Sequence, residues 1–149
     1  MTIPAENAAE LQDLGKLAYA FLLALPVGWY REKEEHTIGV RTFPLVSMAS
    51  CGFVLLGGAP FSSADQSRII QGLVAGIGFI GGGAILKGEG NVHGTATAAS
   101  IWTFGVVGAA VAQGRFLMAF TLALLNLFTL RVLLPLKRKL DTRPEAGEK

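Results

Sequence analysis

The chain has 149 residues, of which 51% are hydrophobic and 16% are charged, and its mean hydropathy is +0.47. This composition is more apolar than that of an ordinary soluble domain, and a net charge of +2 excludes the strongly basic surface of a nucleic-acid-binding protein. A single cysteine, Cys51, excludes an intrachain disulfide. We therefore expect one domain that lies in the lipid bilayer and has no nucleic-acid partner.

Five apolar segments of membrane-spanning length follow one another along the chain. They cover residues 14–30, 44–61, 69–86, 95–112 and 116–136. A spanning helix needs about 17–25 predominantly apolar residues, and the three middle segments contain no charged residue. Lys16 and Arg131, in the first and last segments, lie near enough to an end to reach the membrane interface. The pattern predicts an all-α integral membrane protein, a bundle of about five transmembrane helices.

The basic residues are distributed unevenly between the two sides of these segments. With the N-terminus outside, only Lys16, Arg68 and Arg115 of the 13 Lys and Arg residues would lie at the outer side. Cytoplasmic loops carry the excess of Lys and Arg, so we predict an N-out, C-in orientation. Residues 1–13 would form a short extracytoplasmic N-terminus, residues 14–136 the transmembrane domain, and residues 137–149 a cytoplasmic basic and polar tail.

The third apolar segment contains GIGFIGGG, which begins with the G-x-G-x-x-G pattern of a dinucleotide-binding turn. A dinucleotide fold also needs a strand before the glycines and an acid about 20 residues after them. No Asp or Glu occurs between Glu89 and Asp141, and the apolar segment around the motif is continuous. We therefore favour helix packing over a nucleotide site and expect no cofactor.

The spacing of these glycines favours close contacts between helices. Gly72 and Gly76 are four residues apart, as are Gly78 and Gly82, and small residues at this spacing let two backbones approach closely in lipid. Each of the consecutive glycines 81–83 weakens a helix by about 1 kcal/mol, so this stretch is either restrained by its neighbours or locally broken. We expect this segment to be central to the bundle. The expected packing residues are Gly72, Gly76, Gly78, Gly81, Gly82 and Gly83.

Two blocks of the chain resemble the N-terminal membrane domain of the MgtC/SapB family. The first block, GWYREKEEHTIGVRTFPLV, contains the family's Arg-Glu, Gly-x-Arg-Thr and Leu-Val elements at residues 31–32, 39–42 and 45–46. The second, DQSRIIQGLVAGIGFIGGGAILKGEGNVHGTATAASIW, contains its Asp-x-x-Arg-Ile, glycine-rich, Thr-Ala-Ala-Ser and Trp elements at residues 65–102. The likeness runs from about residue 20 to about residue 135, in the same order and spacing.

The resemblance has departures as well. Tyr30 stands where members usually have an acid, and His93 stands where an arginine is common. We expect no counterpart of the C-terminal soluble domain of the longer members, so the regulation attributed to that domain is not carried over.

The resemblance implies a multi-pass protein of the bacterial inner membrane that matters for growth at low magnesium and, in pathogens, for survival inside host cells. It also implies action through contacts with other membrane proteins, including the F-type ATP synthase; a homodimer is a second expected partner. No nucleophile–base set is visible in the sequence, so we expect a protein without enzymatic activity.

The alternative function is a transporter or channel for Mg²⁺ or another small solute. Mg²⁺ dehydrates reluctantly and prefers hard oxygen ligands in octahedral geometry, yet the three middle segments contain no Asp or Glu. Within one chain, only the carbonyls of a broken segment at residues 81–83 would supply ligands. The sequence therefore favours a protein that acts by contact over a transporter.

Candidate functional residues lie in two loops. In the inner loop, the family pattern falls on Arg31, Glu32, Gly39, Arg41 and Thr42, and both a partner surface and a structural role remain open for them. A structural role would include Arg41 capping the carbonyls of a neighbouring helix.

In the outer loop, Asp65 and Arg68 precede the third apolar segment, where capping of the helix and contact with a partner or ion are both open.

Polar residues inside the segments form a further candidate group. We expect them to form hydrogen bonds across helices, and they are Gln71, Thr97, Ser100 and Asn126. His36 and His93 are isolated in the sequence, so no metal site is expected.

Overall fold

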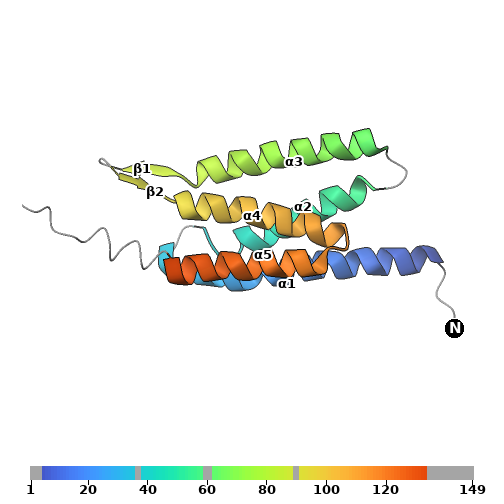
Figure 1. Cartoon of the computed structure of the whole chain (residues 1–149), viewed down its shortest axis with the longest axis horizontal. Helices are drawn as coiled ribbons and strands as arrows, with labels where there is room; N and C mark the ends of the chain where they lie inside the picture. Colours follow the sequence, from blue (N-terminus) through green and yellow to red (C-terminus); the bar gives the residue numbers. More distant parts are fainter. Residues whose placement is uncertain (1–4, 36–37, 59–61, 89–90, 134–149) are drawn as a thin grey trace, which may run out of the picture.

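The structure, a computed structural model, describes residues 5–35, 38–58, 62–88 and 91–133. Five α-helices lie side by side in an elongated bundle (Figure 1). They are α1 (Ala5–Glu35), α2 (Thr42–Leu56), α3 (Ser63–Gly83), α4 (Thr95–Ala112) and α5 (Phe116–Phe128), and a π-helical turn, η1 (Thr129–Leu133), continues α5. The bundle of five helices predicted from the five apolar segments is confirmed.

Helix α1 is longer than its apolar segment. It begins at Ala5, so residues 5–13, predicted as a short N-terminal segment, are already helical. The cytoplasmic tail predicted at residues 137–149 lies outside the described residues, and the N-out, C-in orientation stays a prediction.

A short β-hairpin, which the sequence analysis did not predict, joins α3 to α4. Its strands are β1 (Leu86–Gly88) and β2 (Asn91–His93), and they pair antiparallel with Leu86 opposite His93. Gly94 then begins α4 with a positive φ of 83°, and a Cβ at this position would collide with the carbonyl of Ala84. Glycine is needed here both for the backbone angle and for the close approach.

Helix α4 is the centre of the bundle and contacts all four other helices. Phe104 and Phe43 of α2 meet edge to face, with ring centroids 5.7 Å apart. A Cβ at Gly108 would collide with the backbone carbonyl of Ser47, so α2 and α4 approach as closely as their backbones allow. The core around this contact is built from small and β-branched residues, which suit close helix packing.

The prediction that the third segment is central is wrong, because α3 lies along the edge of the bundle (Figure 1). Only Ile77 and Gly81 of α3 are buried. In the described part of the chain, a Cβ would meet nothing within 4 Å at four of the six glycines expected to pack, which are Gly72, Gly76, Gly82 and Gly83. Gly78 and Gly81 do lie beside α4, near Trp102 and Ala98.

The choice left open for residues 81–83 is settled in favour of a helix. Helix α3 continues to Gly83, and the carbonyls of Gly81 and Gly82 accept hydrogen bonds from the N–H groups of Ala84 and Ile85, both at 3.1 Å. Gly81 packs against Ala98 of α4, and a Cβ on Gly81 would lie 3.5 Å from the Ala98 carbonyl oxygen. This contact restrains the end of the helix.

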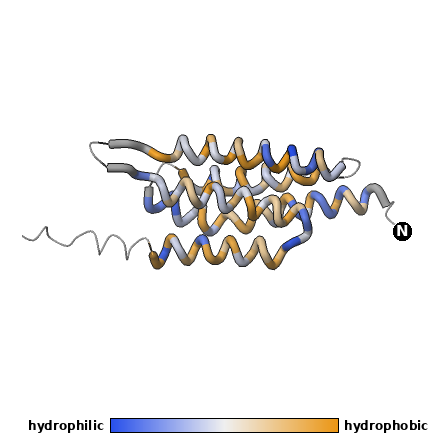
Figure 2. Tube along the Cα trace, turned by 45° about the horizontal axis from the view of Figure 1, so that its top comes forward, coloured by the Kyte–Doolittle hydropathy of each residue, from blue (hydrophilic) through white to orange (hydrophobic). Residues whose placement is uncertain are grey.

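Large apolar side chains cover much of the outside of the bundle. Phe79 on α3 is 85% exposed and Leu117 on α5 is 80% exposed. Hydrophilic residues gather toward the ends of the helices, and the middle of the bundle is mainly hydrophobic (Figure 2). Two helical stretches, Thr95–Ala112 and Phe116–Leu133, are long and apolar enough to cross a membrane.

Candidate functional site

The inner-loop candidates gather where α1 ends, α2 begins and α4 begins. Arg31, near the C-terminal end of α1, is fully buried, and its Nη2 donates a hydrogen bond to Oγ1 of Thr97 in the first turn of α4. These two residues are 66 positions apart in the sequence. The structure thus joins a residue of the first family block to a residue of the second.

Glu32 and Gly39 form the next part of the site. Oε2 of Glu32 accepts a hydrogen bond from the backbone N–H of Val40 at 3.0 Å. A Cβ at Gly39 would collide with the Glu32 side chain, and one at Gly28 would lie 3.0 Å from the Cα of Val40. The turn into α2 therefore lies directly on α1, and Glu32 holds it there.

Arg41 and Thr42 complete the turn. The N–H of Thr42 donates to the carbonyl of Gly39 at 3.1 Å, which closes the turn before α2. Arg41 is exposed and occupies the N-cap position of α2 without a side-chain capping bond. The expected role of Arg41, capping the carbonyls at the end of a neighbouring helix, stays a prediction.

Tyr30, which the sequence analysis noted only as a departure from the family, ties α1 to the end of the last helix. Its hydroxyl donates to the carbonyl of Leu130 at 3.3 Å, and the guanidinium of Arg131 lies 5.5 Å from the centre of its ring. This end of the bundle therefore combines a buried guanidinium, a tyrosine hydroxyl and two exposed arginines, which come from α1, the turn before α2 and η1.

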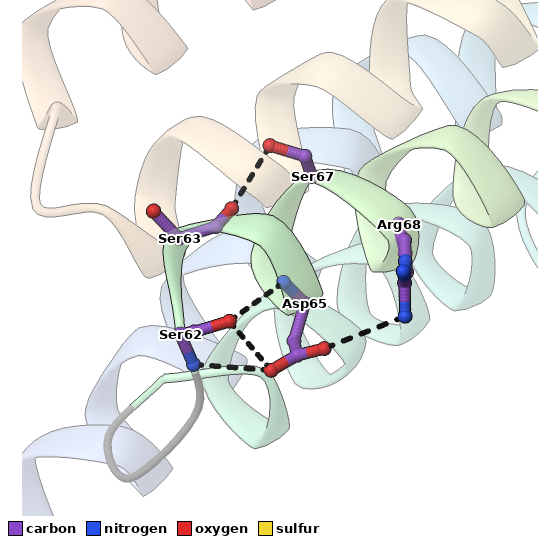
Figure 3. Close-up of polar contacts among 5 residues, drawn as sticks. All are labelled: Ser62, Ser63, Asp65, Ser67 and Arg68. Atoms are coloured by element: carbon purple, nitrogen blue, oxygen red, sulfur yellow. Dashed lines mark hydrogen bonds and ion pairs between the residues drawn. The ribbon is translucent and has the colours of Figure 1, made fainter.

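Asp65 caps helix α3 at the opposite end of the bundle (Figure 3). The side chain of Ser62 accepts from the N–H of Asp65 at 3.2 Å, and Oδ2 of Asp65 accepts from the N–H of Ser62 at 3.3 Å. This reciprocal pair is a capping box. Arg68, whose side chain is 80% exposed, lies 3.9 Å from Asp65. The capping interpretation of Asp65 accounts for these contacts, and Ser62 is the cap residue that sequence reasoning missed.

The four polar residues expected inside the membrane do not behave alike. Thr97 bonds across helices to Arg31, whereas the hydroxyl of Ser100 donates at 2.8 Å to the carbonyl of Ala96 in its own helix. The preceding turn offers a serine a nearby acceptor, which explains why Ser100 bonds within its own helix rather than across helices as expected. Gln71 is exposed, and Oδ1 of Asn126 is buried with no hydrogen-bond partner among the residues that the structure describes.

Metal-ligating side chains do not converge in the described ranges, which contain no group of three or more His, Cys, Asp or Glu residues able to hold an ion. His93 is exposed on the hairpin, and His36 lies outside the described residues.

Comparison with known proteins places both blocks in one family. The model of the MgtC family matches residues 17–139. SrpB of Synechococcus elongatus is 33% identical over 77% of this chain and 71% of its own length. MgtC of Brucella abortus is 36% identical over 66% of this chain and 41% of its own. YhiD of Escherichia coli K12, which carries the provisional name of magnesium transporter, is 30% identical over 78% of this chain and 58% of its own length. No solved structure matches the chain.

Proposed function

Because the chain belongs to the MgtC family, we propose that it is a multi-pass protein of the bacterial inner membrane that acts without enzymatic chemistry. Its action would consist of contacts with other membrane proteins during adaptation to low magnesium or a related stress. The chain spans about half the length of several relatives, with 41% of Brucella MgtC and 58% of YhiD covered. What those longer proteins do is therefore transferred here only as part of the proposal.

The distribution of polarity is the observation that carries the membrane part of the proposal. Polar side chains such as Arg31, Ser47 and Thr97 are buried, whereas large apolar side chains such as Phe79 and Leu117 are exposed. In water, each Å² of exposed apolar surface forgoes about 25 cal/mol of stabilisation, and soluble monomers rarely expose large contiguous apolar patches. A lipid environment removes this penalty.

The outer face of α3 supports action by contact. Gly82 and Gly83 leave open space where a side chain would otherwise stand. Such a surface lets the backbone of another membrane helix approach closely. The F-type ATP synthase is a candidate partner only through the resemblance to the family.

Transport of Mg²⁺ is the second candidate function, and the name of YhiD is what favours it. The carbonyls that a broken glycine segment would have offered to a cation are instead used within the chain, since Gly81 and Gly82 bond to Ala84 and Ile85. The space between α2 and α4 is closed by the contact of Gly108 with Ser47. These two features support the contact function over transport.

Two measurements on the same protein test the proposal. Purified chain in liposomes that contain a magnesium-sensitive dye should show no more Mg²⁺ entry than empty liposomes. A photocrosslinking residue at Gly82 should capture a membrane protein in magnesium-limited cells, whereas the same residue at buried Gly108 should not. Saturable Mg²⁺ uptake that Gly82→Leu abolishes would overturn the proposal in favour of transport.

A further inference from the structure

A polar pocket lies at the end of the bundle where α2 and α4 end and α3 begins. Its volume is ≈ 390 Å³, and its polar lining comes from Asp13 and Lys16 of α1, Gln66 of α3 and Gln113 after α4. The remaining lining includes Leu55, near the end of α2. Three parts of the sequence thus bring one carboxylate, one ammonium group and two amides to a single open pocket.

The charges in this pocket are arranged as a pair. Nζ of Lys16 lies 3.4 Å from Oδ1 of Asp13, and the Lys16 side chain is only 25% exposed. The C-terminal ends of α2 and α4 carry the negative ends of their helix dipoles, and these favour a cation beside Asp13. The pocket therefore complements a ligand that carries both a positive and a negative group.

An apolar groove adjoins this pocket. It lies between α2 and α3, has a volume of ≈ 450 Å³, and is lined by Val46 and Phe53 on one side and by Gly72 and Gly76 on the other. Ile69 lines both the groove and the polar pocket, so its side chain borders the two. The two glycines form the floor of the groove, because they have no side chains to fill it. No other part of the described chain lies within 4 Å of the position that a Cβ would take at either glycine.

The length of the groove matches one leaflet of a bilayer. On α3 it extends from Ile69 to Ile80, which is 11 residues at 1.5 Å each, or about 16 Å. The hydrocarbon core of a bilayer is about 30 Å thick, so a chain that enters at Ile69 would reach about the midplane. A membrane helix fits this site less well than a lipid chain does. An α-helix with its side chains is about 10–12 Å wide, and an apolar helix has no polar group that would bind the Asp13–Lys16 pair.

We propose that the pocket and the groove together bind one phospholipid with an ethanolamine headgroup. The headgroup ammonium donates hydrogen bonds to the carboxylate of Asp13, the phosphate accepts from Lys16, and one acyl chain lies along the groove against Gly72 and Gly76. A choline headgroup has no N–H to donate, so it cannot make the Asp13 contact. This inference rests on the membrane location proposed above.

The test is native mass spectrometry of the full chain, purified in mild detergent and titrated with phosphatidylethanolamine or phosphatidylcholine of identical acyl chains. We expect one phosphatidylethanolamine to bind, with about tenfold preference over phosphatidylcholine, as expected for a hydrogen bond between charged groups. Asp13→Asn should remove most of that preference. Equal binding of the two lipids by the unaltered chain would overturn the proposal.

Two matched variants test the groove. Gly76→Leu fills it and should weaken binding by about tenfold or more, whereas Gly82→Leu lies on the same helix outside the groove and should bind like the unaltered chain. Both changes raise helix propensity by the same amount, so a difference between them reports on the groove. Undiminished binding by Gly76→Leu would overturn the proposal, as would a lipid-free dimer that this variant dissociates, which would assign the groove to a second copy.

Membrane fractionation of the cells that produce the chain distinguishes failure of the proposed function from failure of the lipid site. A chain absent from the membrane fraction contradicts the proposed function itself. A chain that is present there but binds the two lipids equally contradicts only the lipid site.

Discussion

Helices α3 and α4 are both apolar and both contain glycines, but the glycines do different things in each. In α4, Gly105 and Gly108 admit neighbours, the side chain of Ile77 and the backbone of Ser47 respectively. In α3, Gly72 and Gly76 meet no part of the described chain. Glycine spacing therefore predicts that another helix can approach closely. The large residues around the glycines decide whether that neighbour is a helix of the same chain.

The largest expected effect lies at the closest contact of α4. Gly108→Ala places a methyl group against the carbonyl of Ser47, so α2 and α4 must separate, and we expect a loss of about 3 kcal/mol in the free energy of unfolding. Unfolding by SDS in mixed micelles, followed by circular dichroism, measures this loss. The control is Gly76→Ala on α3, and equal stabilities of the two variants would contradict the contrast between the helices.

A second effect concerns the buried polar end of α4. Thr97→Val keeps the shape of the side chain but removes the acceptor of the Arg31 hydrogen bond, and we expect a loss of about 2 kcal/mol because the donor is charged. The same micelle titration reports it. Thr121, whose hydroxyl donates within its own helix, provides the control: if Thr121→Val costs as much, the bond between α1 and α4 is not what Thr97 supplies.

The corresponding change on α3 should be smaller. Asp65→Ala removes half of the capping box with Ser62, and helix caps contribute about 1 kcal/mol. Arg68→Ala, at an exposed ion pair, should change the free energy of unfolding by less than about 0.5 kcal/mol. Amide hydrogen exchange in the first turn of α3 distinguishes the two variants, and unchanged exchange in Asp65→Ala would argue against capping as the role of this residue.

The smallest expected effect has the opposite sign. Gly82→Ala adds a methyl group where the described chain leaves open space, so it should stabilise α3 by about 0.5–1 kcal/mol through helix propensity alone. A higher midpoint in the SDS titration checks this. Destabilisation would mean that a neighbour outside this chain already occupies the face of α3 in micelles.

The five helices could be predicted from the sequence because apolar length is a local property. The position of α3 could not, since Gly72 and Gly76 have the same spacing whether a neighbour covers them or not. The hairpin was missed because its strands have only three residues each, too few for any periodicity to show.

The candidate site was predicted in composition but not in arrangement. The motif pointed to Arg31 and Glu32, yet a charged loop normally faces water, and nothing local to Arg31 indicates full burial. Burial arises because α1 continues to Glu35 and brings the guanidinium to Thr97. A bond between residues so far apart in the sequence is set by the packing of α1 on α4, which no spacing within either block encodes.

The unequal lengths of α1 and α2 have a consequence for the surrounding lipid. The 31 residues of α1 measure about 46 Å and the 15 residues of α2 about 22 Å, on either side of the 30 Å or so of a hydrocarbon core. In a bilayer α1 would tilt or project, while α2 would stop short and draw the interface inward beside it. The protein would then thin the bilayer locally, on the side where α2 ends.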